Sequence, residues 1–153
     1  KSSIKKILDT IPMDSLEEEV LKKGKPFLGI CVGMQVLADS GDEGGESQGL
    51  GWIPGVIEKI KTDQAPLPHI GWNNIEVTQE TEVFNGLKNI NDFYFVHSYA
   101  FCKIKEENIL AKVEYESSIV AAVNKDNIYG VQFHPEKSQR AGQLILKNFL
   151  NIS

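Results

Sequence analysis

Residues 25–37, KPFLGICVGMQVL, decide the fold of this chain. An apolar run typical of a buried strand breaks at Gly29-Ile30-Cys31-Val32-Gly33 and continues as the start of an amphipathic helix. This is the Gly-x-nucleophile-x-Gly turn between strand and helix, with cysteine in the nucleophile position. We expect the two glycines to permit a sharp turn that lifts the Cys31 sulfur above the sheet. We also expect the helix N-terminus to favour the thiolate, because its free N–H groups stabilise negative charge. The alternative is that Cys31 is a small buried residue after a core strand.

Length and composition indicate one globular α/β domain over residues 1–153. The chain is 41% hydrophobic, which is enough to build a single core. A net charge of −5 without a basic patch argues against a nucleic-acid binder. No apolar run approaches the roughly 20 residues of a membrane span, and no signal-peptide core is present, so a cytoplasmic location is expected. The two cysteines, Cys31 and Cys102, lie too far apart to indicate a disulfide framework or a zinc site.

The remaining pattern predicts a few helices followed by a strand-rich half. Helices are expected over residues 2–9 and 15–23, the second closed by Gly24, and from the elbow to about Ser40, followed by a glycine-rich loop over 41–49. Strands are predicted at 56–60, 69–77, 93–101, 109–115, 119–124 and 129–133, with a hairpin turn at 124–127. A closing helix over 139–150 is expected to bury Leu144, Ile145, Phe149 and Leu150.

The elbow strand belongs at the centre of an open sheet, yet no strand precedes it in the sequence. We therefore expect that the chain begins late and is the N-terminally incomplete version of a longer protein.

A second motif supplies partners for a thiol nucleophile. The apolar run of residues 129–133 ends at His134, and Pro135 restricts the residue before it to extended geometry. Residues 134 and 136 are then expected to project to the same side, so that Glu136 orients the His134 imidazole. The alternative is a packed histidine at a strand end beside a solvated glutamate. The presence of both motifs in one chain favours the catalytic interpretation.

The other two histidines are ambiguous. His69 starts a predicted strand, and His97 lies in the aromatic segment 93–99. Either could be a structural residue of the core. Three histidines without a thiol or carboxylate at ligand spacing make a metal site unfavourable. No cofactor is implied.

Taken together, GICVGMQ (29–35) and VQFHPEKS (131–138) resemble the class I, or triad, glutamine amidotransferases. Within that family, PHIGWN (68–73) and YFVHSY (94–99) are similar to the glutaminase subunits of imidazole glycerol phosphate synthase, an enzyme of histidine biosynthesis. The resemblance covers about Gly24 to Phe149. It implies a flavodoxin-like, three-layer open sheet, here without its N-terminal strands.

The resemblance also implies a role for each matching residue. Cys31 would be the nucleophile, His134 the general base and acid, and Glu136 its orienting carboxylate. The Val32 N–H would stabilise the oxyanion. The glutamine substrate would be held by four residues: Gln35, Glu43, Ser98 and Tyr99. Without the resemblance, Gln35 and Glu43 would be interpreted as exposed helix and loop residues.

The implied partner is a (β/α)8 synthase subunit, with which the chain would form a heterodimer and to which it would pass ammonia. His69, Trp72 and Lys137 lie in motifs that face this partner in relatives. The family also carries an N-terminal Pro-Gly-x-Gly loop with a second oxyanion donor, which this sequence lacks. We therefore expect the 153-residue chain alone to be inactive.

Several alternatives remain open. The closest is a paralogous glutaminase that supplies ammonia to a surface-polysaccharide amidination enzyme. A cysteine peptidase of the same layout would not need Gln35 or Glu43. A docking subunit with a vestigial site would not need Cys31, His134 or Glu136. The glutaminases of anthranilate, guanylate, cytidylate and carbamoyl-phosphate synthesis share the triad but not PHIGWN.

Overall fold

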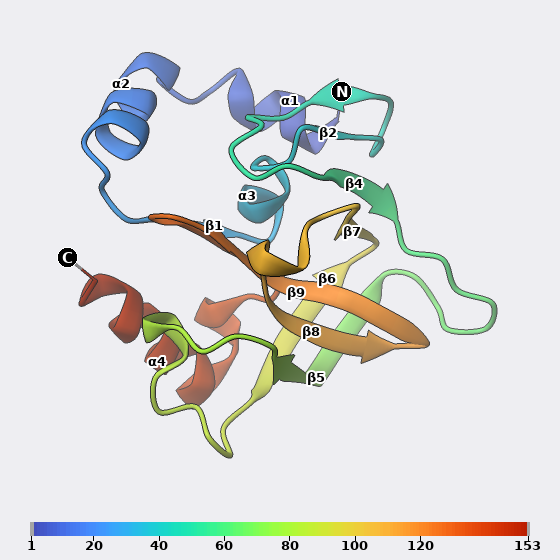
Figure 1. The fold of residues 1–153 in the computed structure, drawn as a ribbon. Helices are drawn as coiled ribbons and strands as arrows, with labels where there is room; N and C mark the ends of the chain where they lie inside the picture. Colours follow the sequence, from blue (N-terminus) through green and yellow to red (C-terminus); the bar gives the residue numbers. More distant parts are fainter. Residues whose placement is uncertain (1, 153) are drawn as a thin grey trace.

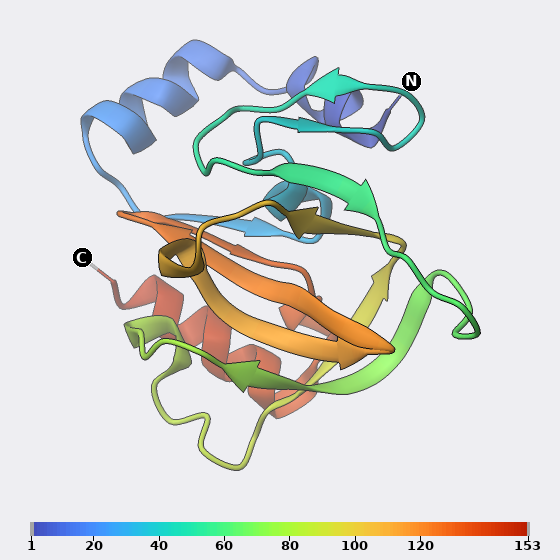
Figure 2. The ribbon, with the colours of Figure 1, turned by 45° about the vertical axis from the view of Figure 1, so that its right-hand side comes forward.

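A computed structural model describes residues 2–152. Its main sheet has six strands in the order β1-β10-β9-β8-β5-β6. Only β1 (Phe27–Ile30) and β10 (Ile128–Val131) run parallel in this sheet, and every other neighbouring pair is antiparallel. The remaining strands of the sheet are β5 (His69–Val77), β6 (Asp92–His97), β8 (Ile109–Tyr115) and β9 (Ser117–Lys125). The sheet curls strongly along its length (Figure 2).

A second sheet of four short strands packs beside the first, in the order β3-β2-β4-β7. Its strands are β2 (Ser40–Gly41), β3 (Ser47–Gln48), β4 (Val56–Lys59) and β7 (Tyr99–Cys102). The chain crosses from the main sheet to this one at Ser98, whose carbonyl accepts a hydrogen bond from the N–H of Ile60 at 2.9 Å. The prediction of one continuous strand over 93–101 is therefore wrong at Ser98, because the segments before and after this residue pair with strands of different sheets.

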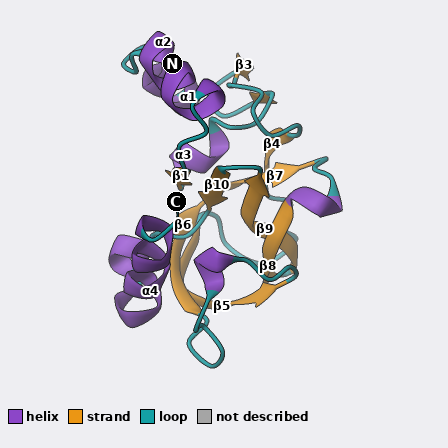
Figure 3. Ribbon diagram, turned by 60° about the vertical axis from the view of Figure 1, so that its left-hand side comes forward, coloured by secondary structure: helices purple, strands orange, loops and turns teal. Residues whose placement is uncertain are grey.

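Helices cover both faces of the main sheet, which gives the predicted three-layer α/β arrangement (Figures 1 and 3). On one side lie α1 (Ser3–Leu8), α2 (Met13–Glu17) and α3 (Val32–Gln35), and on the other lies α4 (Gln139–Leu150). α2 continues into a π-helical turn over Glu18–Lys22, and three 3-10 turns cover Glu82–Phe84, Glu106–Asn108 and Pro135–Lys137. Side chains alternate along β10: Val131 packs into the core beneath α4, and Ile128 packs into the core beneath α3.

The helix after the elbow is much shorter than the sequence predicts. It ends at Gln35 rather than near Ser40. The carbonyls of residues 36–38 accept hydrogen bonds from the N–H groups of Leu50, Ile53 and Gly51 at 2.7–3.0 Å, so another helical turn cannot use them. The predicted loop 41–49 likewise contains the β2–β3 hairpin.

The last residue of α4 also differs from expectation. Leu150 is 79% exposed, whereas Ile145 is fully buried. Five residues rotate a helix by about 140° from its starting direction, which turns Leu150 away from the face that Ile145 presents to the core. By contrast, the bounds of α4, β5 and β8 are as predicted.

The elbow is built differently from the sequence interpretation. The residue with a positive φ is Cys31 itself, with φ 54° and ψ −109°. Neither glycine of the motif has a positive φ. Gly29 is required for space, because a Cβ there would lie 2.2 Å from the carbonyl oxygen of Gly33. Gly33 has open space around the same position. The backbone of the new helix therefore rests directly on the strand at Gly29.

Two alanine substitutions separate these glycines. Gly29→Ala should destabilise the fold by about 2 kcal/mol or more, because the clash is with backbone that cannot turn aside. Gly33→Ala should be neutral or stabilise by up to about 1 kcal/mol, because alanine favours helix. Urea unfolding followed by circular dichroism measures both. Equal effects of the two substitutions would contradict the close approach at Gly29.

Candidate active site

Cys31 lies directly after β1, at the carboxyl end of the only parallel pair in the main sheet. Its N–H donates to the carbonyl of Val131 on β10 at 2.8 Å. Its Sγ lies 3.9 Å from the carbonyl oxygen of Val96 on β6 and 3.7 Å from Nε2 of Gln132. The N–H of Val32 also points at the sulfur. The thiol is thus surrounded by two donors and one acceptor at the start of α3.

His134 follows β10 by three residues and is joined to Glu136. Its Nδ1 lies 2.5 Å from Oε1 of Glu136, which confirms that the two side chains project together. Because a carboxylate accepts, this contact assigns the proton to Nδ1 and leaves Nε2 as an acceptor. Nε2 is buried and has no hydrogen-bond partner among the described residues. The imidazole therefore presents one free basic nitrogen in a protected position.

The turn that carries His134 and Glu136 is fastened to β6. The N–H of His134 donates to the carbonyl of Tyr94 at 3.0 Å. The buried Ser138 hydroxyl donates to the His134 carbonyl at 2.6 Å and accepts from the Tyr94 N–H at 2.9 Å. Ser138 has no predicted role, although it is the last residue of the VQFHPEKS motif of residues 131–138. Its signal was a serine placed just before the start of a helix.

The structure brings Cys31 and His134 to the same edge of the sheet. They follow adjacent parallel strands, and both are tied to carbonyls of β6, at Val96 and at Tyr94. Carbonyls two residues apart on a strand point the same way and are about 7 Å apart. A thiol and an imidazole on one such edge form a nucleophile and base constellation.

The four predicted substrate-binding residues surround this edge in different ways. Gln35 is 3% exposed, and its amide bonds the carbonyl of Tyr99 and the Oε1 of Gln132, both at 3.3 Å. Ser98 and Tyr99 lie at the crossing between the two sheets. Glu43 is half-buried in the β2–β3 turn, and its charge acts on the Cys31 thiol. Gln35 is therefore not the exposed helix residue that the alternative interpretation required.

The Cys31 thiol does not have the lowered pKa that the sequence analysis expected. Burial raises the pKa above its ordinary value, and the charges of Glu136 and Glu43 raise it further. The N–H of Val32 and the amide of Gln132 act in the opposite direction without overcoming burial. The expected lowering of the Cys31 pKa by the helix N-terminus is therefore wrong. Helix α3 has a single turn, and the partial burial of the thiol outweighs the effect of its N–H groups.

His69 and His97 form a buried pair behind the site. His97 donates from Nδ1 to the Tyr99 carbonyl at 2.9 Å, so its Nε2 accepts from Nδ1 of His69 at 3.0 Å. His69 also stacks between Phe95 and Tyr115. At 3% exposure, His69 has no free surface in the chain as described. Both rings are held in single tautomers by neutral partners.

The other two predicted partner-facing residues are exposed near the site. Trp72 on β5 is 46% exposed and meets the Tyr94 ring edge-to-face, with centroids 6.0 Å apart. Lys137 is exposed and follows Glu136 directly. Ile70, two residues before Trp72, is 59% exposed. Two large apolar side chains of β5, Ile70 and Trp72, are thus exposed beside the site.

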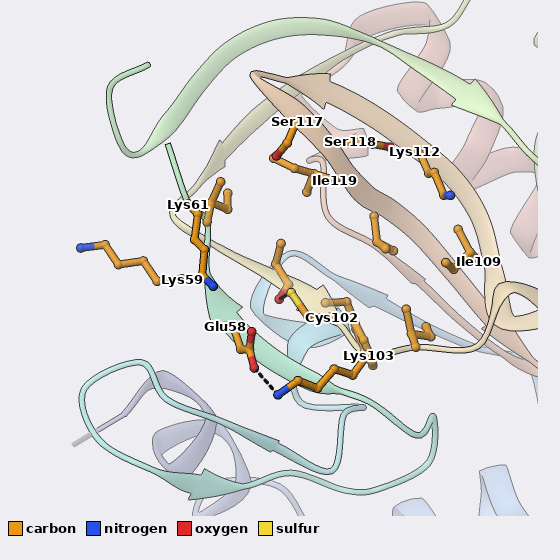
Figure 4. A pocket seen from close by; sticks show the side chains of 15 residues that line it. Glu58, Lys59, Lys61, Cys102, Lys103, Ile109, Lys112, Ser117, Ser118 and Ile119 are labelled. Carbon is orange, nitrogen blue, oxygen red and sulfur yellow. Dashed lines mark hydrogen bonds and ion pairs between the residues drawn. The ribbon is translucent and has the colours of Figure 1, made fainter. Parts of the chain in front are cut away.

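A separate cavity of about 430 Å³ lies between β4, β7, β8 and β9 (Figure 4). The Cys102 sulfur and the Glu58–Lys103 ion pair line it, and neither Cys31 nor His134 does. Cys102 is half-buried, and burial raises the pKa of its thiol. Among residues 2–152, no group of three histidine, cysteine or acidic residues could hold a metal ion, and no helix there is long and apolar enough to cross a membrane.

The His97 pair makes a pH prediction. Burial lowers the pKa of His97 from 6.5 to about 4, so the unfolded chain binds a proton between these values that the folded chain does not. Stability should therefore fall as the pH drops below about 6.5, by about 2 kcal/mol at pH 5 from this residue. Urea unfolding of wild type and His97→Asn at pH 7 and pH 5 measures the difference. An equal loss in both proteins would exclude His97 as its source.

An elbow cysteine and a His-x-Glu pair at the ends of adjacent parallel strands, within this sheet arrangement, are the features expected of a class I glutamine amidotransferase. The family model "Glutamine amidotransferase class-I" matches residues 11–152, and the chain belongs to that family. It is 48% identical over 142 residues to the imidazole glycerol phosphate synthase subunit HisH of Pelagibacter ubique, covering 92% of this chain and 68% of that protein. It is 42% identical over 153 residues to HisH 1 of Campylobacter jejuni (strain RM1221), covering 99% and 76%.

A solved glutamine amidotransferase from Thermotoga maritima has the same fold, with a TM-score of 0.55 at 21% identity. The match covers 90% of this chain and 52% of that one. The resemblance expected from the sequence is thereby confirmed at the level of family and fold.

Proposed function

We propose that this chain is the glutaminase subunit of an imidazole glycerol phosphate synthase, which releases ammonia from glutamine for histidine biosynthesis. The proposal is carried by one observation: Cys31 and the His134–Glu136 pair follow the two adjacent parallel strands β1 and β10. The names of the two similar curated proteins support the choice of pathway.

In the proposed reaction, Nε2 of His134 takes the proton of the Cys31 thiol as the sulfur attacks the δ-carbonyl of glutamine. The carbonyl oxygen becomes an oxyanion, which the Val32 N–H stabilises; one such donor contributes about 3 kcal/mol in comparable sites. The His134 proton then passes to the leaving nitrogen, and ammonia departs. Water, deprotonated by His134, hydrolyses the thioester to glutamate and restores the thiol.

The high thiol pKa fits this scheme. A buried thiol that stays protonated at rest needs a base in place, and the free Nε2 of His134 is available for that purpose. Glu136 holds the proton on Nδ1 and balances the charge of the imidazolium. For the substrate, Glu43 would receive the α-ammonium group, while Ser98 and Tyr99 would orient the remainder.

The proposed partner is a (β/α)8 synthase subunit in a cytoplasmic heterodimer, a lyase as a whole, into which the ammonia is channelled. Trp72 and Lys137 would contact it directly. His69 would not contact it directly, since its own side chain is buried. The role of a non-catalytic docking subunit is an outcome of the experiments below, and the names of the similar curated proteins favour histidine biosynthesis over the paralogous route to polysaccharide amidination.

A glutamine-analogue electrophile, 6-diazo-5-oxonorleucine, tests the nucleophile. Mass spectrometry should find it on Cys31 and not on Cys102, because only Cys31 lies at the sheet edge that also carries the His134–Glu136 pair. Cys31→Ala should abolish labelling and ammonia release, Cys102→Ser should change neither, and Glu136→Gln should slow both by about 10²-fold or more. The assay uses the chain with and without the synthase partner and its nucleotide ligand. Ammonia release by Cys31→Ala, or no labelling in the complete complex, would refute the proposal.

Trp72→Ala tests the docking face. A half-exposed tryptophan near a second exposed apolar residue, Ile70, is typical of a residue that dominates binding, so the substitution should weaken the complex by about 2 kcal/mol or more, about 30-fold. Labelling of Cys31 in the free chain should not change. Val77→Ala, at the far end of the same strand and 38% exposed, is the matched control. Titration calorimetry with the partner measures both, and equal affinities of the two variants would exclude this face.

A further inference from the structure

Gln132 is a fully buried polar side chain in the middle of an apolar run, and neither the sequence analysis nor the proposed reaction uses it. It is 0% exposed, between Val131 and Phe133. A primary amide has two donors and an acceptor, so its burial is unfavourable unless they are bonded. The partners of Gln132 are Cys31 and Gln35.

The orientation of the Gln132 amide follows from donor and acceptor rules. The backbone carbonyl of Tyr99 can only accept, so the group of Gln35 that faces it must be the NH₂. The same NH₂ lies 3.3 Å from Gln132, which must therefore turn its oxygen toward Gln35. Its own NH₂ is left facing Sγ of Cys31 at 3.7 Å. These three contacts, taken in order, orient the Gln132 amide so that its NH₂ group donates to the sulfur of Cys31.

This donor matters because the surroundings of Cys31 otherwise oppose its ionisation. The Val96 carbonyl accepts from the thiol but repels a thiolate. The charged groups that act on the sulfur from the neighbouring segments, Glu136 and Glu43, are both acidic, and burial acts in the same direction. The Val32 N–H and the Gln132 amide favour the charged form, as would the His134 imidazolium once it has formed in the proposed reaction. The Val32 N–H is also the proposed donor to the oxyanion, so it cannot serve the sulfur throughout the reaction.

We propose that Gln132 is a positioning residue that holds the Cys31 sulfur and stabilises its thiolate, and that Gln35 acts by locking the orientation of the Gln132 amide. The assignment gives Gln35 a role inside the protein, whereas the resemblance implied contact with substrate. The ionisation of the Cys31 thiol can be measured without the reaction, whereas the effect of Gln132 on catalysis rests on the proposed function.

The pKa of Cys31, measured from the pH dependence of its alkylation by iodoacetamide in a Cys102→Ser background, tests the proposal. Gln132→Met keeps the volume and removes the donor, so the pKa should rise by about 0.5 to 1 unit, and alkylation at pH 7 should slow about three- to tenfold. Gln143→Met, on the exposed face of α4, is the matched control and should have no effect. Circular dichroism checks that each variant is folded.

A double-substitution cycle tests the role of Gln35. Gln35→Met should raise the pKa of Cys31 by less than Gln132→Met does, and the double variant should match Gln132→Met alone, because Gln35 acts only through Gln132. Gln132→Glu retains the acceptor for Gln35 and adds a charge, so it should raise the pKa at least as much; it replaces the methionine variant if that variant does not fold.

An unchanged pKa in folded Gln132→Met or Gln132→Glu would overturn the proposal, and additive effects in the double variant would overturn the role of Gln35. If the chain is a glutaminase, Gln132→Met should lower kcat and leave KM nearly unchanged. A pKa shift without glutaminase activity in any form of the protein would refute the proposed function and leave this inference standing.

Discussion

The parallel pairing of β1 with β10 is the constraint on which the site depends. These strands come from distant parts of the chain, and their register places Ile30 opposite Val131. Because the strands are parallel, the residues that leave them emerge at one edge of the sheet. The N–H of Cys31 donates to the carbonyl of Val131 at that edge, and His134 lies three residues after Val131. An antiparallel pairing of the same two segments would place the sulfur and the imidazole at opposite ends.

β6 turns this edge into a site. It lies at the far end of the six-strand order, yet the curl of the sheet carries its carbonyls back to Cys31 and to the His134 turn. Ser138 fastens the turn to β6 from the other side. β6 then crosses at Ser98 into β7, where Tyr99 joins the second sheet and accepts from both Gln35 and His97. One strand thus connects Cys31, His134 and the buried polar network.

The chemistry of the site follows from burial as much as from the catalytic residues themselves. Removing the sulfur from water favours the protonated thiol, and two acidic groups reinforce that preference. Because Glu136 binds Nδ1 of His134, Nε2 is left as a basic nitrogen that is also buried. It has no hydrogen-bond partner among the described residues. Neutral amide and imidazole groups fill the space behind, in two hydrogen-bonded chains that each begin at the Tyr99 carbonyl. In the proposed reaction, such a site would hold its proton at rest and release it when substrate arrives.

The sequence by itself determined most of the elements and the identity of the candidate reactive groups. The apolar periods of β5, β8 and α4 are local properties of the chain, and the elbow and His-Pro-Glu motifs are short enough to be recognised without a fold. Tertiary structure decided where helix α3 stops, because carbonyls 36–38 bond to a later loop, and where the aromatic strand breaks, because its halves join different sheets. It also decided the sign of the Cys31 pKa shift and the partners of Gln132. These depend on burial and on hydrogen bonds between residues about a hundred positions apart, and no local pattern in a single sequence records such contacts.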